Sequence, residues 1–143
     1  MAARRILIVE DEMMIAMMVA MMVEDFLADL GWTPVGVAGT LDKALAMARD
    51  ADIDAALLDV NLSGRDTFGV ATILIERNIP FVFATGYGAQ GIAERFRAAP
   101  TLTKPYQLDE LDRALRQAVA GAERQHADPE TEESPRGTSD TAQ

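Results

Sequence analysis

Short apolar runs alternate with helical patterns five times along this chain of 143 residues, and that alternation constrains its fold more than any other feature. Runs such as Ile6–Val9 and Phe81–Phe83 contain no polar residue, which is typical of strands covered on both faces. Strands that alternate with helices form a parallel sheet with helices on either side. The pattern therefore predicts an α/β protein with a doubly wound sheet.

The order of the predicted elements defines the topology of this sheet. Strands are expected at residues 6–9, 34–38, 55–58, 80–84 and 101–103, and helices at 13–30, 41–49, 66–77, 90–97 and 108–120. Thr40 is expected to cap the second helix, since its side chain can accept a hydrogen bond from a free backbone N–H. We predict a (βα)5 flavodoxin-like, doubly wound parallel sheet of strand order 2-1-3-4-5, in which the first and third strands are neighbours.

A change of composition divides the chain into a domain and a tail. Residues 1–120 form the predicted domain, which is long enough to bury a core. Residues 121–143 are rich in acids, with two prolines and almost nothing apolar after residue 122. Such a segment cannot bury enough surface to offset the entropy lost on ordering, so we predict a disordered acidic tail.

Charge and composition exclude several classes of protein. The net charge is -10 and no run of Lys and Arg occurs, which argues against nucleic acid as a partner. The chain has no Cys, which excludes disulfides and thiolate metal sites. The longest apolar stretch, Met13–Val23, is too short to cross a bilayer. We expect a soluble, cytoplasmic protein without membrane insertion.

Polar side chains follow the predicted strands where each strand ends. Glu10 and Asp11 follow the first strand, Asp59 the third, Thr85 the fourth and Lys104 the fifth. Because the carboxyl ends of parallel strands meet at one edge of a sheet, these side chains should converge. Carboxylates suit Mg²⁺, and a carboxylate such as Asp59 can accept a phosphoryl group. Lys104 and Thr85 would then stabilise the phosphoryl oxygens.

This set of motifs resembles the receiver domain of two-component response regulators, over about residues 4–120. The resemblance implies that Asp59 accepts a phosphoryl group from a sensor histidine kinase or a phosphotransfer protein. It also implies a Mg²⁺ site, in which Asp11 is a direct ligand and Glu10 acts nearby. Asp59 and the backbone carbonyl of Asn61 would complete the protein ligands.

Further motifs extend the resemblance to individual residues and to one subgroup of the family. Thr85 resembles the switch hydroxyl of the family, and Lys104 resembles its phosphate-pairing lysine, followed by Pro105, which is usually cis. The run Phe83-Ala-Thr-Gly-Tyr87 resembles the signature of the "FAT GUY" subgroup of single-domain receivers, best known in alphaproteobacteria.

One position departs from the family pattern. Receivers usually carry an aromatic switch residue on the fifth strand, three residues before the lysine, and Thr101 stands there in this chain. Tyr87 and Tyr106 are the two candidates to replace it as the partner of Thr85.

The first helix is unusually rich in methionine and apolar all round. Its methionines form two adjacent stripes: Met13, Met14, Met17, Met18, Met21 and Met22. One interpretation is core packing, and the other is a partner surface, since adaptable Met suits loosely specific binding. In the family this helix docks on the kinase, so the second interpretation predicts that exposed methionines contact it.

Taken together, the residues and the resemblance predict a single-domain response regulator of a two-component or phosphorelay system rather than a turnover enzyme. Its output would be a changed contact with a downstream protein, or removal of phosphate from a shared kinase. A Mg²⁺ phosphohydrolase is a rival, although Glu10-Asp11-Glu12 lacks the second Asp that such enzymes place two residues after the nucleophile. A phosphorylation-independent adaptor is the alternative that Thr101 leaves open. No oligomeric state is predicted.

Overall fold

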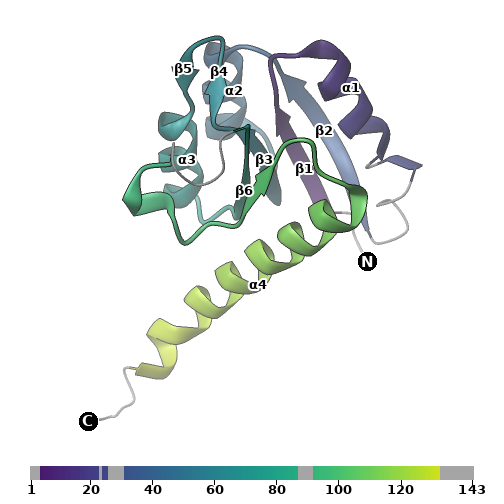
Figure 1. The fold of residues 1–143 in the computed structure, drawn as a ribbon. Coiled ribbons are helices and arrows are strands. Elements are labelled where there is room, and N and C mark those ends of the chain that lie inside the picture. Colours follow the sequence, from purple (N-terminus) through teal and green to yellow (C-terminus); the bar gives the residue numbers. More distant parts are fainter. Residues whose placement is uncertain (1–3, 23, 26–30, 87–91, 133–143) are drawn as a thin grey trace.

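The computed structural model describes residues 4–22, 24–25, 31–86 and 92–132 of the chain (Figure 1). The strands are β1 (Arg4–Val9), β2 (Trp32–Ala38), β3 (Ala55–Asp59), β4 (Asn61–Leu62), β5 (Arg65–Asp66), β6 (Phe81–Thr85) and β7 (Thr101–Thr103). The helices are α1 (Met13–Met22), α2 (Leu41–Asp50), α3 (Phe68–Glu76), the short 3₁₀ helix η4 (Glu94–Phe96) and α4 (Leu108–Glu132).

Five strands form one parallel sheet in the order β2-β1-β3-β6-β7. Since β6 and β7 are the fourth and fifth of the predicted strands, the predicted order 2-1-3-4-5 is confirmed. The strands β4 and β5 form a small antiparallel hairpin after β3, which the sequence analysis did not predict. Asp66 pairs with Asn61 in this hairpin, so α3 begins at Phe68 and not at Asp66.

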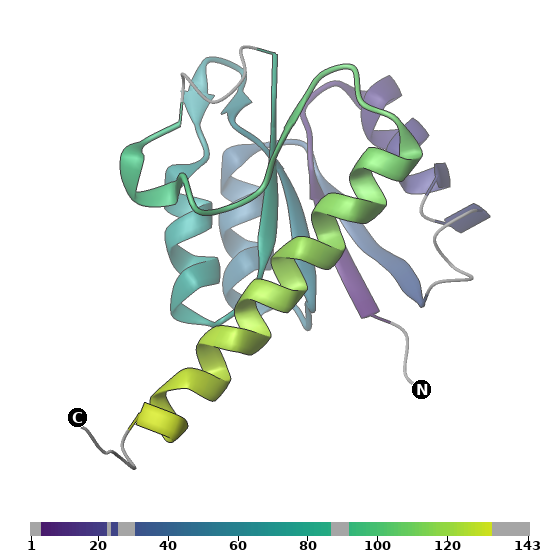
Figure 2. The same cartoon turned by 60° about the horizontal axis from the view of Figure 1, so that its bottom comes forward.

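Helices cover both faces of the sheet, α2 and α3 on one and α1 and α4 on the other (Figures 1 and 2). Neighbouring residues of β1 point to opposite faces. Leu7 and Val9 join the core under α2 and α3, whereas Ile6 and Ile8 join the core under α1 and α4. A strand buried on both faces has no place for a polar side chain, which explains its continuous apolar run.

The cap of α2 is the predicted one. The hydroxyl of Thr40 accepts a hydrogen bond from the backbone N–H of Lys43 at 3.2 Å, and Thr40 itself keeps an extended backbone. A cap of this kind satisfies one of the free N–H groups of the first turn, so α2 begins at Leu41 as expected.

The last helix is longer than predicted. The predicted helix ended at Ala120, but α4 continues to Glu132, and this end projects beyond the sheet in Figure 1. The prediction of disorder from residue 121 is therefore wrong for residues 121–132. These residues include few apolar side chains that could be buried in a core. However, Ala, Glu, Arg and Gln have high helix propensity, so they can extend a helix that the core has already nucleated. The division into a domain and a tail stays a prediction, and residues 133–143 lie outside the described part.

Two further predicted helices differ from the structure. Of the helix expected at 90–97, the described residues show only η4, and residues 87–91 lie outside them. The first helix ends at Met22, and part of its predicted extension, residues 23 and 26–30, is likewise not described. Among the helices of the described ranges, none has both the length and the hydropathy needed to cross a membrane.

Candidate functional site

Three acids meet at the edge of the sheet where β1 and β3 end. Glu10 directly follows β1, Asp11 comes next, and Asp59 is the last residue of β3. One carboxylate oxygen from each lies within 4.8 Å of the others. Glu10 and Asp59 are buried and Asp11 is half-buried. The sheet order therefore brings together the three predicted carboxylates, in a set of hard oxygen donors that suits Mg²⁺.

Lys104 joins two of these acids. Its ammonium nitrogen lies 2.8 Å from Oε1 of Glu10 and 2.9 Å from Oδ2 of Asp59. The end of the sheet positions it, because the backbone N–H of Lys104 donates to the carbonyl of Thr85 at 2.9 Å. The Lys104–Pro105 peptide bond is cis, as the family resemblance implied.

In this group of Lys104, Glu10 and Asp59, burial and the ionic hydrogen bonds shift the pKa values of Lys104 and Glu10 in opposite directions. Burial lowers the pKa of Lys104, but its hydrogen bonds to Glu10 and Asp59 outweigh that effect and raise the pKa above its ordinary value. Burial raises the pKa of Glu10, and the hydrogen bond from Lys104 offsets this only in part. Lys104 therefore stays charged, while burial makes the Glu10 carboxyl take up a proton more readily than an exposed glutamate would.

Asp11 is held by the hairpin on the far side of the site. Its Oδ2 accepts hydrogen bonds from the backbone N–H of Ser63 at 2.9 Å and from the Ser63 hydroxyl at 3.2 Å. Ser63 and Gly64, which form the tight turn between β4 and β5, both adopt positive φ, 51° and 86°. Burial raises the pKa of Asp11, but the bonds from Ser63 outweigh it and lower the pKa. Ser63 was not predicted as a site residue; only its place beside a loop glycine hinted at a turn.

Asn61 and Thr67 support the loop around Asp59. The backbone N–H of Asn61 donates to Oδ1 of Asp59 at 3.3 Å, and the Asn61 side chain accepts from the Gly64 N–H at 2.9 Å. Thr67 is fully buried, and its hydroxyl donates to the backbone carbonyl of Asp59 at 2.7 Å. Thr67 was missed by the sequence analysis, because nothing in its neighbourhood distinguishes it from an ordinary helix cap.

The structure describes two of the three residues considered for the switch, Thr85 and Tyr106. Thr85 is buried at the end of β6, next to Ala84, which is in register with Asp59. Tyr87 lies outside the described residues. Tyr106 packs half-buried against the core under α1 and α4, and burial together with the charge of Glu10 raises its pKa to about 12. Tyr106 therefore lies within electrostatic reach of the acids.

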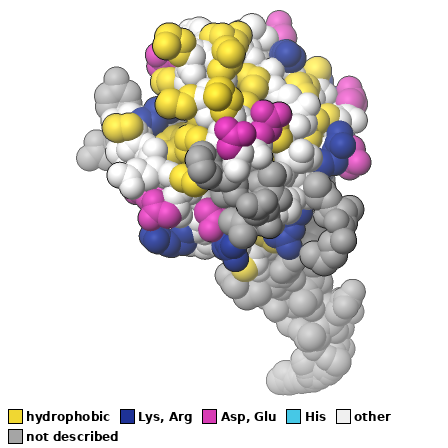
Figure 3. Space-filling model, turned by 90° about the vertical axis from the view of Figure 1, so that its right-hand side faces the viewer, with side chains coloured by type: hydrophobic (Ala, Val, Ile, Leu, Met, Phe, Trp, Pro, Cys, Tyr) yellow, Lys and Arg dark blue, Asp and Glu magenta, His cyan; other side chains and the backbone are white. Residues whose placement is uncertain are grey.

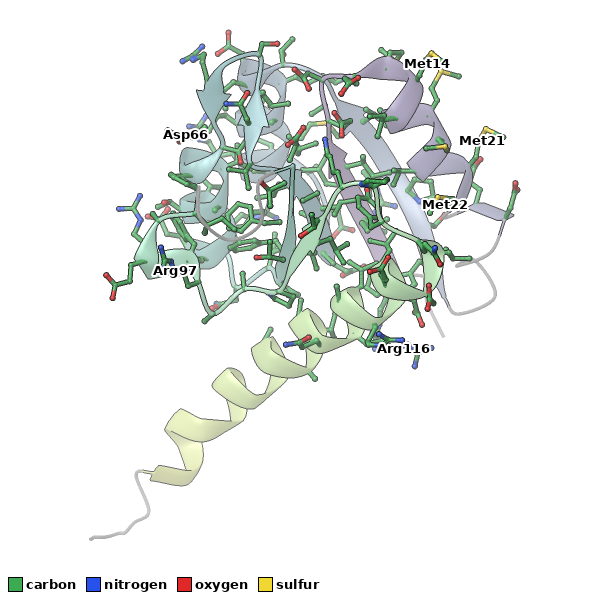
Figure 4. The ribbon with its side chains drawn as sticks, viewed as in Figure 1. Met14, Met21, Met22, Asp66, Arg97 and Arg116 are labelled. Carbon is green, nitrogen blue, oxygen red and sulfur yellow. The ribbon has the colours of Figure 1, made fainter. Side chains whose placement is uncertain are left out.

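The methionines of α1 lie mostly outside the core. Ala16 and Val19 are the buried residues of α1, and Met22 is half-buried. Five methionines are more than half exposed: Met13, Met14, Met17, Met18 and Met21. Hydrophobic side chains gather on the face that carries α1 (Figure 3), and Met14 and Met21 point outward in Figure 4. Core packing is therefore wrong for these five, which we call the methionine face.

Comparison with known proteins identifies the family. The model of the response regulator receiver domain matches residues 6–116. The chain belongs to this family. The predicted resemblance is thereby confirmed, and the chain is a receiver domain of the kind used in two-component signalling.

Individual relatives agree with this assignment. The solution structure of SdrG from Sphingomonas melonis Fr1 is 48% identical, with a TM-score of 0.68, and the match covers 83% of this chain and 98% of that one. The BeF3-activated conformation of SdrG from Pseudomonas melonis Fr1 is 49% identical, with a TM-score of 0.66, over 82% of this chain and 98% of that one. The transcriptional regulatory protein PdtaR of Mycobacterium tuberculosis is 33% identical over 121 residues, which are 82% of this chain but 57% of PdtaR. The chain thus spans little more than half the length of PdtaR.

Proposed function

We propose that this receiver accepts a phosphoryl group on Asp59 from a sensor histidine kinase or a phosphotransfer protein. The observation that carries the proposal is the position of Asp59, whose carboxylate contacts Lys104 at 2.9 Å and lies beside Glu10 and Asp11. A buried carboxylate flanked by a cation and two further acids is suited to accept a phosphoryl group.

The transfer follows from these contacts. A carboxylate oxygen of Asp59 forms the new O–P bond while the P–N bond to the donor histidine breaks, and the released imidazole takes up a proton. Lys104 neutralises charge on the transferred oxygens, and the hydroxyl of Thr85 donates a hydrogen bond to one of them. The backbone N–H of Asn61, which reaches Oδ1 of Asp59 at 3.3 Å, keeps the carboxylate oriented.

The donor set fits Mg²⁺. Glu10, Asp11 and Asp59 supply carboxylate oxygens within 4.8 Å of one another. The backbone carbonyl of Asn61 would complete the protein ligands, as the family resemblance implies. The hydrogen bonds from Ser63 favour the ionised form of Asp11, which is the form a cation requires. When bound, the ion neutralises negative charge on the acids and on the phosphoryl oxygens.

The output is a changed protein contact. Phosphorylation adds about -1.5 to -2 charges at the acid cluster, and only part of that is offset by Lys104. We propose that Thr85 moves towards the new group and remodels the loop that follows β6. A BeF3-activated conformation exists for SdrG, 49% identical to this chain, which supports an activated state of this kind. The receiver would act in the cytoplasm, either on a downstream protein or as a phosphate sink, without turnover of a small substrate.

The experiment is intact-protein mass spectrometry after incubation with phosphoramidate, with and without Mg²⁺. We expect the wild type to gain one phosphoryl group only with Mg²⁺, and Asp59→Asn to gain none. Asp42→Asn, at an exposed acid of α2, is the matched control and should behave as the wild type.

A different result would favour the phosphorylation-independent adaptor. No gain in the wild type, or the same gain in Asp59→Asn, would contradict Asp59 as the acceptor. If a partner bound Asp59→Asn and phosphorylated wild type equally well, the switch through Thr85 would be refuted, even with phosphorylation intact.

A further inference from the structure

The methionine face has a chemical property that the phosphoacceptor site does not use. Six of the eight methionines of the chain lie in the ten residues of α1, and five of them are exposed by 56 to 85%. The helix contains no charged residue. Thioether sulfur is the most readily oxidised group such a surface can present, and its susceptibility follows exposure.

We propose that the methionine face is a site of reversible oxidation by peroxides. In each event with hydrogen peroxide, the oxidant used in the test below, the thioether sulfur gives two electrons to the peroxide, an S–O bond forms, the O–O bond breaks, and water leaves. The reverse step is the work of a methionine sulfoxide reductase, in which a dithiol becomes a disulfide and the oxygen leaves as water.

The consequence is a change in the character of the surface. A sulfoxide is polar where the thioether was apolar, so five events convert an exposed apolar patch into a polar one. Exposed acids flank the apolar patch, with Glu12 before the helix and Glu24 and Asp25 after it. Oxidation would thus weaken any apolar contact that a partner makes with this patch. The identification of that partner as the phosphoryl donor rests on the proposed function.

The fold should survive this chemistry, because different residues of α1 hold the helix to the sheet. Val19 is buried in the core shared with α4, Ala16 is fully buried, and Ile15 packs against that same core. The acid cluster also lies outside the affected surface, since Glu10 and Asp59 are buried against Lys104. Oxidation of the methionine face is therefore expected to leave both stability and Asp59 chemistry nearly unchanged.

The chain contains its own control for exposure. Met47 on α2 packs against the core under α2 and α3, close to Gly36. Met22, the last residue of α1, is half-buried against the core under α1 and α4. Both carry the same thioether as the exposed set, so a difference in rate reports exposure and not chemistry.

The test treats the whole chain with hydrogen peroxide and maps oxidised residues by peptide mass spectrometry. We expect the five residues of the methionine face to be oxidised roughly tenfold faster than the half-buried Met47 and Met22. Binding of an apolar fluorescent dye should fall on oxidation, whereas circular dichroism and phosphorylation of Asp59 by phosphoramidate should not change. A sulfoxide reductase with dithiothreitol should restore the dye signal.

The matched variant replaces all five exposed methionines by leucine, which keeps an apolar surface of similar volume but cannot be oxidised. Its dye signal should resist peroxide. Oxidation of Met47 at the same rate, or a dye signal that peroxide leaves unchanged in the wild type, would overturn the proposal. An equal fall of the dye signal in the leucine variant would overturn it too. Failure of phosphoramidate labelling before any peroxide is added would instead refute the proposed function and leave the oxidation result standing.

Discussion

Replacement of Lys104 by methionine removes the one cation that the structure places among the described acids of the cluster. Lys104→Met keeps much of the side-chain volume but leaves Glu10 and Asp59, both buried, without their ammonium partner. Because two carboxylates then face each other in a partly dehydrated site, the folded state should lose free energy relative to the unfolded state.

The magnitude follows from the two contacts. At 2.8 and 2.9 Å, each attraction is about 6 kcal/mol for an effective dielectric constant of about 20. Most of this is cancelled by the dehydration of Lys104, so a hydrogen bond to a charged group stabilises by about 1.5–3 kcal/mol net. Since Glu10 can relax by taking up a proton, we take the lower end for both bonds. The expected loss is about 3 kcal/mol in the free energy of unfolding near neutral pH.

The loss should also depend on pH and on Mg²⁺. Burial already raises the pKa of Glu10, and without Lys104 it rises further. A carboxyl whose folded pKa is raised favours folding below its unfolded pKa, and that contribution is lost as the pH rises through the folded pKa. The difference between wild type and Lys104→Met should therefore be smaller at about pH 5 than at about pH 7. Millimolar Mg²⁺ should reduce it too, because the ion binds the folded acids.

The assay is urea denaturation in EDTA and in MgCl₂, followed by circular dichroism. Lys43→Met is the control: it alters the only other lysine, which is exposed on α2, and should change the free energy of unfolding by less than about 0.5 kcal/mol. A loss under about 1 kcal/mol for Lys104→Met in EDTA, or one that grows as the pH falls, would refute this account of the cluster.

Three further outcomes are expected. In Tyr87→Phe, Tyr106 is the only tyrosine, and its absorbance at alkaline pH should report a pKa of about 12; a midpoint near 10, the ordinary value of tyrosine, would contradict its burial near the acids. Thr67→Val should lower the free energy of unfolding by about 1–3 kcal/mol in urea titrations, since it leaves a buried carbonyl without its donor; an unchanged midpoint would count against that bond. Ser63→Ala should weaken Mg²⁺ binding, measured calorimetrically, by up to about tenfold, because Asp11 loses a donor that orients it; unaltered affinity would make that contact incidental.

Much of the site could be predicted because it depends on strand ends. Once the alternation of elements predicts a parallel sheet, each residue that follows a strand is assigned to the same edge, whatever its distance along the chain. Glu10, Asp59 and Lys104 converge in this way, and the bonds from Lys104 to the other two confirm that they meet. The order of the strands was predictable for the same reason, since the handedness of strand–helix–strand connections leaves few arrangements.

Other features depend on contacts that no local pattern encodes. The bond from Ser63 to Asp11 joins residues 52 positions apart through a hairpin of four paired residues, which is too short to leave a periodic signal. The helical state of residues 121–132 was missed because a polar composition predicts poor burial but does not distinguish an isolated helix extension from a coil.

For the methionines of α1, too, the sequence determined one property and the tertiary structure another. The sequence alone determined a helix that is apolar all round, but it left core packing and exposure as equal interpretations. The tertiary structure decided between them, because α1 rests on the sheet through Ala16 and Val19 and so can bury only one side. Hydrophobic pattern is a property of the chain, whereas exposure is set by which side of each element the rest of the fold covers, and that depends on the packing of all elements together.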